Sequence, residues 1–425
     1  VDNTTLLVDA SINKAAWNSG VDGRPECDTH PNDEDWCKKK ESWRTVLVGG
    51  MGLGGASRDN GATCTQCVKA PVGLTGLTQL GLSSYYALDV TDQKNPKLLW
   101  EFSHPDLGYT TAEPVIVRIN GKYNGNPDPS RNGKWFVVIP SGPTGPIDTD
   151  FHQFYAKSDK LLKIFVIDLA ATPDSTGKLT LNSDYWVIDT LSDGTTQIPN
   201  AFGGSLATNA IDTDKINKYS SGYYSTDVVY IGYTKANSNP VTSTTTWTKG
   251  GLLRLLTKED PDPANWALST VIDDIGPVTA SIDKLYDDNG PSLWLFFGTG
   301  RYFYKKGTVL DSETPLMGLY GIKEPCYTSL KDMNPACSAA AFTVSDLQNQ
   351  STTIASSIGS KMGWYITLDA KDTPTTGYAA ERVITAPSVR TNGLLQFTTY
   401  KPTADPCGFG GQTLFWYVDY ATGGL

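Results

Sequence analysis

A pattern of short strands recurs along this chain with a period of roughly 60 to 100 residues, as in propellers and other repeat arrays. Each copy has an opening strand led by Pro or Gly, an Asp/Asn turn, a strongly apolar strand and an outer aromatic or aliphatic strand. One copy runs through PVIVRI (114–119), KWFVVIPSG (134–142) and LLKIFVIDLA (161–170). The apolar strands of later copies are DVVYIGYT (227–234), SLWLFFGTG (292–300) and LLQFTTY (394–400).

Such a unit cannot bury both faces of its apolar strand by itself, so the copies must stack on one another. Radial stacking gives a β-propeller, which also protects the strand edges. A β-sandwich would instead place strands at roughly 8 to 12 residue intervals without the larger period. The sequence therefore predicts an all-β chain with one β-propeller domain over residues 1–425, and Ser345 to Ile358 is its best candidate for a short helix.

The first part of the chain departs from this pattern. Residues 1–44 are polar and predict a loop-rich opening segment, and Thr45 to Val48 predicts a short strand that runs into GGMGLGG (49–55). These glycines match G-x-G-x-x-G, but a turn sequence follows them where a dinucleotide site needs a helix, which favours a tight glycine turn. The stretch from Ser84 to Ile119 predicts one meander of three strands, at Tyr85 to Val90, Lys97 to Phe102 and Pro114 to Ile119.

Composition excludes some classes of function. The 425 residues carry a formal net charge of -10 with no basic stripe, so nucleic-acid binding is not expected. No apolar run is long enough for a transmembrane helix. With 41 Gly, 25 Pro and 21 Tyr, the chain favours short strands and turns over helices.

Six of the seven cysteines fall into pairs within polar loops: Cys27 with Cys37, Cys64 with Cys67, and Cys326 with Cys337, while Cys407 is left over. Such pairs favour disulfides and an oxidising compartment. Zinc is the alternative at Cys64 and Cys67, although no second Cys or His pair stands at a usable spacing. The region 56–83 predicts a cysteine-containing loop insertion.

Enzyme signatures are scarce. The three histidines are His30, His104 and His152, and neither a G-x-S-x-G elbow nor H-E-x-x-H is present. Propellers host glycosidases and quinone-dependent dehydrogenases. Carboxylates are common enough in this sequence to supply the pair that a glycosidase uses, so the glycosidase class stays open. A deep central pocket with convergent polar groups would favour an enzyme.

Motifs spread along most of the chain resemble the C-terminal domain of the PilY/PilC-type type IV pilus biogenesis factors. The motifs are WRTVLVGG (43–50), YALDVT (86–91), LWEF (99–102), DLGY (106–109), PVI (114–116), FGTGRY (297–302), ERV (381–383) and DPC with GG (405–407, 410–411). The resemblance implies a modified seven-bladed propeller, secreted and located at the cell surface or pilus tip. It implies roles in pilus assembly, retraction control and adhesion through minor pilins and a host or mineral surface, and it does not imply catalysis.

The resemblance also implies two structural features. Many members carry an EF-hand-like calcium loop, and its place here is Asp212, Asp214 and Asp227, with Ile216 and Ser220 standing where further ligands would be. Calcium at this loop is expected to switch a loop conformation and a protein contact. The strand segment that usually opens the family's propeller would lie upstream of Val1, so an upstream fragment or a separate chain is expected to complete the first blade. The alternatives are a propeller enzyme and a structural subunit of another surface filament.

Overall fold

The computed structural model describes residues 5–13, 38, 40–55, 70–71, 80–81, 83–123, 126–128, 131–145, 147–148, 153–194, 196–215, 222, 224–242, 244–287, 290–302, 305–306, 309–310, 317–372, 377–403 and 410–424. Within these residues the chain contains strands and short 3-10 turns and no α-helix. The predicted all-β class is therefore confirmed.

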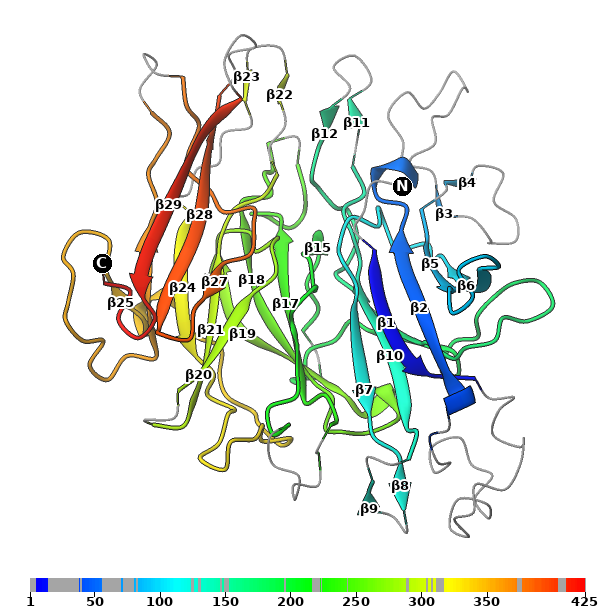
Figure 1. The fold of residues 1–425 in the computed structure, drawn as a ribbon. Helices are drawn as coiled ribbons and strands as arrows, with labels where there is room; N and C mark the ends of the chain where they lie inside the picture. The colour runs from blue at the N-terminus through cyan, green and yellow to red at the C-terminus, as the bar shows by residue number, and fades with distance from the viewer. Residues whose placement is uncertain are drawn as a thin grey trace.

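Five mainly antiparallel sheets follow one another along the chain and stand as a fan in Figure 1. The first contains β1 (Leu6–Ser11), β2 (Trp43–Gly50), β5 (Tyr85–Asp89) and β6 (Lys97–Phe102). The second contains β7 (Val115–Ile119), β10 (Lys134–Pro140), β13 (Ile164–Asp168) and β14 (Tyr185–Ile188). The third contains β15 (Ala201–Gly203), β16 (Ala210–Ile211), β17 (Val228–Lys235), β18 (Lys249–Leu256) and β19 (Ala267–Ile275).

The fourth sheet contains β20 (Asp283–Asp287), β21 (Ser292–Gly298), β24 (Gly318–Lys323), β25 (Gln348–Asn349) and β26 (Gly363–Thr367), and the fifth contains β27 (Ser388–Val389), β28 (Leu394–Pro402) and β29 (Gly411–Asp419). Short pairs join β3 (Ala70–Pro71) to β4 (Leu80–Gly81), β8 (Lys122–Tyr123) to β9 (Asn126–Pro127), β11 (Ile147–Asp148) to β12 (Gln153–Phe154) and β22 (Lys305–Lys306) to β23 (Val309–Leu310). The 3-10 turns are η2 (Lys40–Ser42), η3 (Leu53–Gly55), η4 (Pro263–Asn265) and η5 (Val344–Asp346).

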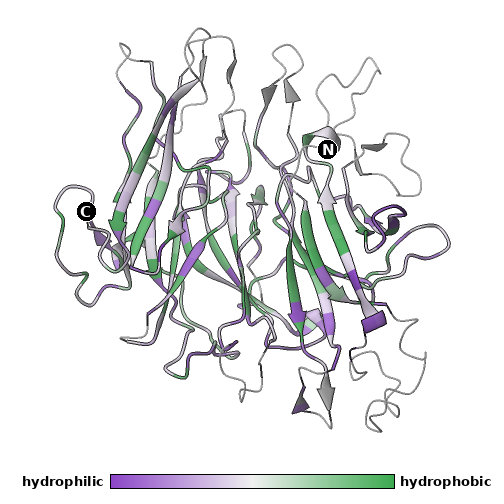
Figure 2. Cartoon of the chain, viewed as in Figure 1, coloured by the Kyte–Doolittle hydropathy of each residue, from purple (hydrophilic) through white to green (hydrophobic). Residues whose placement is uncertain are grey.

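Alternation along the central strands explains why the sheets stack. In β21, Leu293, Leu295 and Phe297 enter the core shared with the third sheet. Trp294 and Phe296 point the other way, into the core shared with the fifth sheet. Because successive side chains of a strand face opposite sides, an uninterrupted apolar strand must be covered on both faces. Figure 2 shows these apolar strands in green within the fan.

Four hydrophobic cores join the five sheets in chain order. The two outer faces of the fan are exposed: Leu7 on β1 is 63% exposed, and Phe415 on β29 is 61% exposed. Within the described residues, no such core joins the fifth sheet to the first. The predicted count of seven blades therefore stays a prediction.

The backbone also links neighbouring sheets where each central strand ends. The N–H of Gly203 donates to the carbonyl of Ser141 over 2.8 Å, which joins the third sheet to the second. The N–H of Val383 donates to the carbonyl of Thr299 over 2.9 Å, near the junction of the fifth sheet with the fourth. A Cβ on Gly232 would lie 2.5 Å from the carbonyl oxygen of Val278, so glycine permits the close approach there.

Four local predictions need correction. The stretch Ser84–Ile119 is not one meander, because β5 and β6 end the first sheet whereas β7 begins the second. Ser345 to Ile358 forms no α-helix; only η5 and the two-residue strand β25 fall there. The opening segment contributes the strand β1, which pairs along its whole length with β2. The repeat pattern also predicts an opening strand at GPVTASID (276–283), but residues 276–282 only lead into β20, which begins at Asp283.

The prediction of a tight glycine turn at 49–55 is confirmed. The glycine run ends β2 and enters η3, with Gly52 at a φ of 57°, as a tight glycine turn requires. Among the described residues no helix is long and apolar enough to cross a membrane.

Candidate functional site

The three predicted calcium ligands converge in the structure. Asp212 and Asp214 follow β16, and Asp227 directly precedes β17, the strand that pairs with β16. One carboxylate oxygen from each of the three lies within 4.8 Å of the others. The turn between paired strands therefore returns the third carboxylate to the first two, although many residues separate them in sequence.

Two carboxylates that the sequence did not single out complete the cluster. Glu259 comes from the turn after β18, and Asp332 comes from the loop after β24 in the fourth sheet. With Asp214 they form a second triad whose oxygens also lie within 4.8 Å of one another. Figure 1 shows the green segment after β16 and the yellow loop after β24 meeting at the lower end of the fan.

The loop that carries Asp332 is closed by a disulfide between Cys326 and Cys337. This confirms one of the three predicted cysteine pairs. Cys27, Cys37, Cys64 and Cys67 lie outside the described residues, as does Cys407.

Hydrogen bonds organise only part of the acidic cluster. Thr213 donates its N–H and its hydroxyl to Oδ2 of Asp227, over 2.6 and 2.7 Å. The same hydroxyl lies 3.4 Å from Oδ1 of Asp332. Asp214 is only 2% exposed, and among the described residues neither of its carboxylate oxygens has a hydrogen-bond partner. Burying a carboxylate without hydrogen-bond donors is costly, and a bound cation would offset that cost.

The electrostatics agree with that interpretation. Burial, followed by the neighbouring Asp214 and Asp227, raises the pKa of Asp212 to about 8. Burial is also the main cause that raises the pKa of Asp227 to about 8 and that of Glu259 to about 7. Within the described part of the chain, no Lys or Arg forms an ion pair with any of the five carboxylates. Clustered carboxylate oxygens are the ligands that Ca²⁺ prefers.

A separate cavity lies where the inner ends of the sheets meet. It has a volume of about 450 Å³. Its lining includes Leu53 near β2, Phe202 on β15, Thr279 before β20, Arg301 after β21 and Ile384 before β27. Contributions from every part of the fan support a radial arrangement around an axis. Among the described residues that line this cavity there is no Asp, Glu or His, and hence no carboxylate pair of the kind that glycoside hydrolysis requires.

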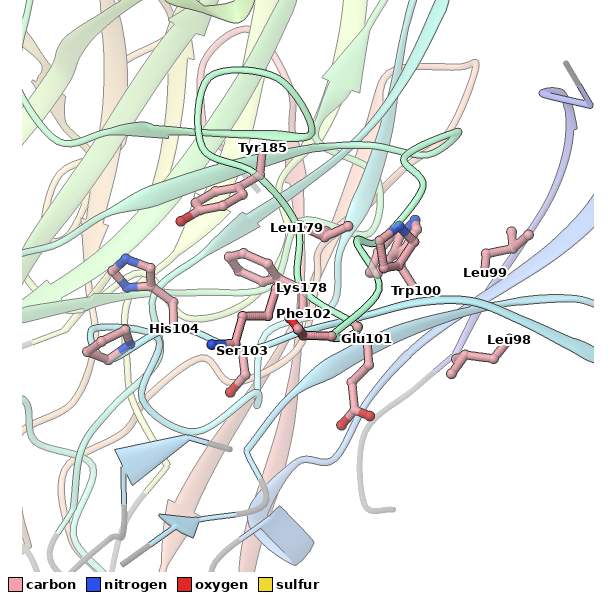
Figure 3. Close-up of a pocket in the computed structure, with 14 residues that line it drawn as sticks. Leu98, Leu99, Trp100, Glu101, Phe102, Ser103, His104, Lys178, Leu179 and Tyr185 are labelled. Carbon is pink, nitrogen blue, oxygen red and sulfur yellow. The ribbon is translucent and has the colours of Figure 1, made fainter. Parts of the chain in front are cut away.

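A larger groove of about 780 Å³ runs along β6 and the loop 173–179 (Figure 3). The rings of Phe102, His104 and Tyr185 gather along one side of it, with the Phe102 and Tyr185 centroids 5.0 Å apart. Burial lowers the pKa of His104, and Nδ1 of that ring accepts from the N–H of Asp106 over 3.1 Å. Glu101 is the only carboxylate among the described lining residues, which therefore provide no carboxylate pair here either.

Comparisons with known proteins agree with the sequence motifs. No protein-family model matches the chain. The type IV pilus biogenesis factor PilY1 of Pseudomonas aeruginosa is 25% identical over 388 residues, which cover 83% of this chain and 29% of that protein. A PilY1 homolog of Xylella fastidiosa is 25% identical over 414 residues, which cover 90% of this chain and 22% of that protein. The chain thus spans less than a third of the length of these curated relatives.

The fold comparison points the same way. The crystal structure of the Pseudomonas aeruginosa PilY1 C-terminal domain matches with a TM-score of 0.54 and 19% identity, over 91% of this chain and 69% of that one. The resemblance drawn from the sequence is therefore confirmed: this chain is similar in sequence to the PilY1-type pilus biogenesis factors and in fold to their C-terminal domain.

Proposed function

We propose that this chain is the propeller-like part of a non-enzymatic protein that supports type IV pilus assembly, controls retraction and mediates adhesion at the cell surface. The observation that carries this proposal is the similarity to PilY1-type proteins along 83 to 90% of the chain. Minor pilins at the pilus tip and a host or mineral surface are the proposed partners. The rigid stack of sheets supplies a scaffold, and the loops at its ends supply the contact surfaces.

The cavities support a binding role over an enzymatic one. Among the described residues, neither the central cavity nor the groove along β6 brings together two carboxylates. Ser103 and His104 both line the groove, but the Ser103 hydroxyl donates to the carbonyl of Ser83. A strand added from an upstream segment or a separate chain also belongs to this proposal. Among the described residues the first sheet, where this strand was expected, already has four strands, whereas the fifth has three and its strand β29 pairs with β28 alone. The fifth sheet therefore offers an edge for such a strand.

Deleting the gene in its host tests the pilus assignment. We expect fewer surface pili, weaker twitching and weaker adhesion, all restored when the wild-type gene is supplied. Unchanged pilus number, motility and adhesion in the deletion strain would refute the proposal. A strain lacking the major pilin is the control, since it shows how far each measurement can fall.

We also propose that Asp212, Asp214 and Asp227 bind Ca²⁺ and that the ion stabilises the loops around β16 and β17. A ligand that binds only the folded state raises its stability, and a hundredfold excess over the dissociation constant adds about 2.7 kcal/mol. Ca²⁺ should therefore raise the Tm of the wild-type chain and raise that of Asp212→Ala much less. Identical thermal shifts in the two proteins would remove the calcium site.

A further inference from the structure

The five carboxylates form two triads that share one member. The first is Asp212, Asp214 and Asp227, and the second is Asp214, Glu259 and Asp332. In each triad the candidate ligand oxygens lie within 4.8 Å of one another. Two oxygens bound to the same Ca²⁺ at about 2.3 to 2.6 Å are separated by at most about 5 Å, so each triad has the dimensions of one ion site.

Asp214 is the residue that joins the triads. Its side chain is almost completely buried, and within the described part of the chain neither carboxylate oxygen has a hydrogen-bond partner. A single ion in the first triad would use one of these oxygens and leave the second triad uncompensated. A carboxylate that bridges two cations satisfies both of its oxygens.

A cavity lies beside Glu259 and Asp332 of the second triad and beside Asp227 of the first, and Asp214 is not among the described residues that line it. The cavity has a volume of about 110 Å³, and Asp227, Glu259 and Asp332 line it together with Lys258. Because one water occupies about 30 Å³ of liquid, this space accommodates an ion with a few waters. Ca²⁺ commonly completes its six to eight ligands with water. Lys258 forms no ion pair with these carboxylates among the described residues, so it does not neutralise them.

The backbone is arranged to present Glu259 to this place. Lys258 and Glu259 both have a φ of 53°, in the left-handed region that non-glycine residues avoid. Residues held in this way cluster at ligand sites, where the surrounding structure fixes them. Gly222 packs directly against the Glu259 carboxylate, and any Cβ at that position would collide with it.

We propose that the chain binds two divalent cations, the second held by Asp214, Glu259 and Asp332. Together the two cations cross-link the third and fourth sheets. This inference rests on the proposed calcium site, because the two ions share Asp214. Two divalent ions offset four of the five carboxylate charges, whereas one ion leaves three uncompensated. The second ion ties the turn after β18 to the disulfide loop after β24.

Counting bound Ca²⁺ on the metal-stripped 425-residue chain, by calorimetric titration and by native mass spectrometry, tests the proposal. We expect two ions per wild-type chain. Glu259→Gln and Asp332→Asn should each leave one, and Asp212→Asn should also leave one. Asp262→Asn is the matched control, because Asp262 lies in the same turn as Glu259 but is exposed, and asparagine also caps η4.

The outcomes separate this inference from the calcium site itself. One ion that every cluster variant abolishes would mean a single site spanning five carboxylates, which overturns the second ion and keeps the first. One ion lost in Asp212→Asn but retained in Glu259→Gln and Asp332→Asn would also overturn it. No bound ion in the wild type would remove both proposals. Circular dichroism and thermal melts of each variant identify any that fails to fold, and Glu259→Asp then replaces Glu259→Gln.

Discussion

Buried polar residues join neighbouring sheets as well as the apolar cores do. Arg254 on β18 and Glu324 after β24 form an ion pair with 2.5 Å between Nη1 and Oε1, and both side chains are almost completely buried. Tyr230 donates to the other carboxylate oxygen over 2.7 Å, and the N–H of Cys326 donates to Oε1 over 2.8 Å. Glu324 therefore binds groups from both the third and the fourth sheet.

Removing one partner of this pair should be far worse than removing both. Glu324→Ala leaves the Arg254 guanidinium buried and unpaired, which costs about 3 to 5 kcal/mol of unfolding free energy. The double variant Arg254→Met/Glu324→Leu should lose much less, because apolar groups fill the same space without a stranded charge. Urea unfolding of both variants measures the difference. Equal losses of unfolding free energy in the two variants would show that the unpaired charge on Arg254 is not the main cost of Glu324→Ala.

At the scale of elements, the metal-free acidic cluster should make stability depend on pH. Burial raises the pKa of Asp212 and that of Asp227 to about 8, whereas an aspartate in the unfolded chain has a pKa of about 4. Between these values the folded chain keeps protons that the unfolded chain loses. This contribution to stability is therefore complete below about pH 4 and is lost as pH rises through about 8.

Urea unfolding in a chelator measures this effect. The contribution of Asp212 and Asp227 should make the metal-free wild type less stable at about pH 8.5 than at about pH 5.5. The double variant Asp212→Asn/Asp227→Asn should show a flatter pH dependence, because its amides do not titrate. A wild type and double variant with the same pH profile would contradict the prediction.

The disulfide loop is the element that carries Asp332 to the cluster. Cys326 and Cys337 are 11 residues apart, and closing a loop of that size contributes about 3 kcal/mol through the unfolded state. Cys326→Ala/Cys337→Ala should therefore lower the unfolding free energy by about that amount. The same variant should bind Ca²⁺ more weakly, since Asp332 is no longer held in place. Calcium affinity equal to that of wild type would show that the loop holds its shape without the disulfide.

The sequence predicted the bounds of individual strands better than it predicted which distant segments pack against one another. The strand predicted at Lys97 to Phe102 has the same bounds in the structure, because its polar turn and alternation are local signals. The strand β1 had no such signal, and its pairing with β2 creates it. Glu259 and Asp332 were missed for the same reason, since only the packing of the fourth sheet on the third brings them to Asp214.

At the scale of the whole molecule, the stack of sheets explains both stability and exposure. Each internal sheet is covered on both faces, so its apolar strand contributes side chains to two hydrophobic cores. The first and fifth sheets have only one neighbour each within the described residues. Their outer faces are therefore the surfaces on which a partner or a further strand of the proposed pilus assembly would pack.

Neighbouring phenylalanines on the fifth sheet test this arrangement. Phe397 on β28 is fully buried in the core shared with the fourth sheet, whereas Phe415 on β29 is 61% exposed on the other face. Phe397→Ala should cost about 3 to 5 kcal/mol, because it removes a large buried side chain and leaves a cavity. Phe415→Ala should change the unfolding free energy by no more than about 0.5 kcal/mol, as surface substitutions do. If urea unfolding of the isolated chain instead gave Phe415→Ala a loss as large as that of Phe397→Ala, the outer face would have to be covered by the chain itself. A ring closed by the first and fifth sheets would then replace the open fan.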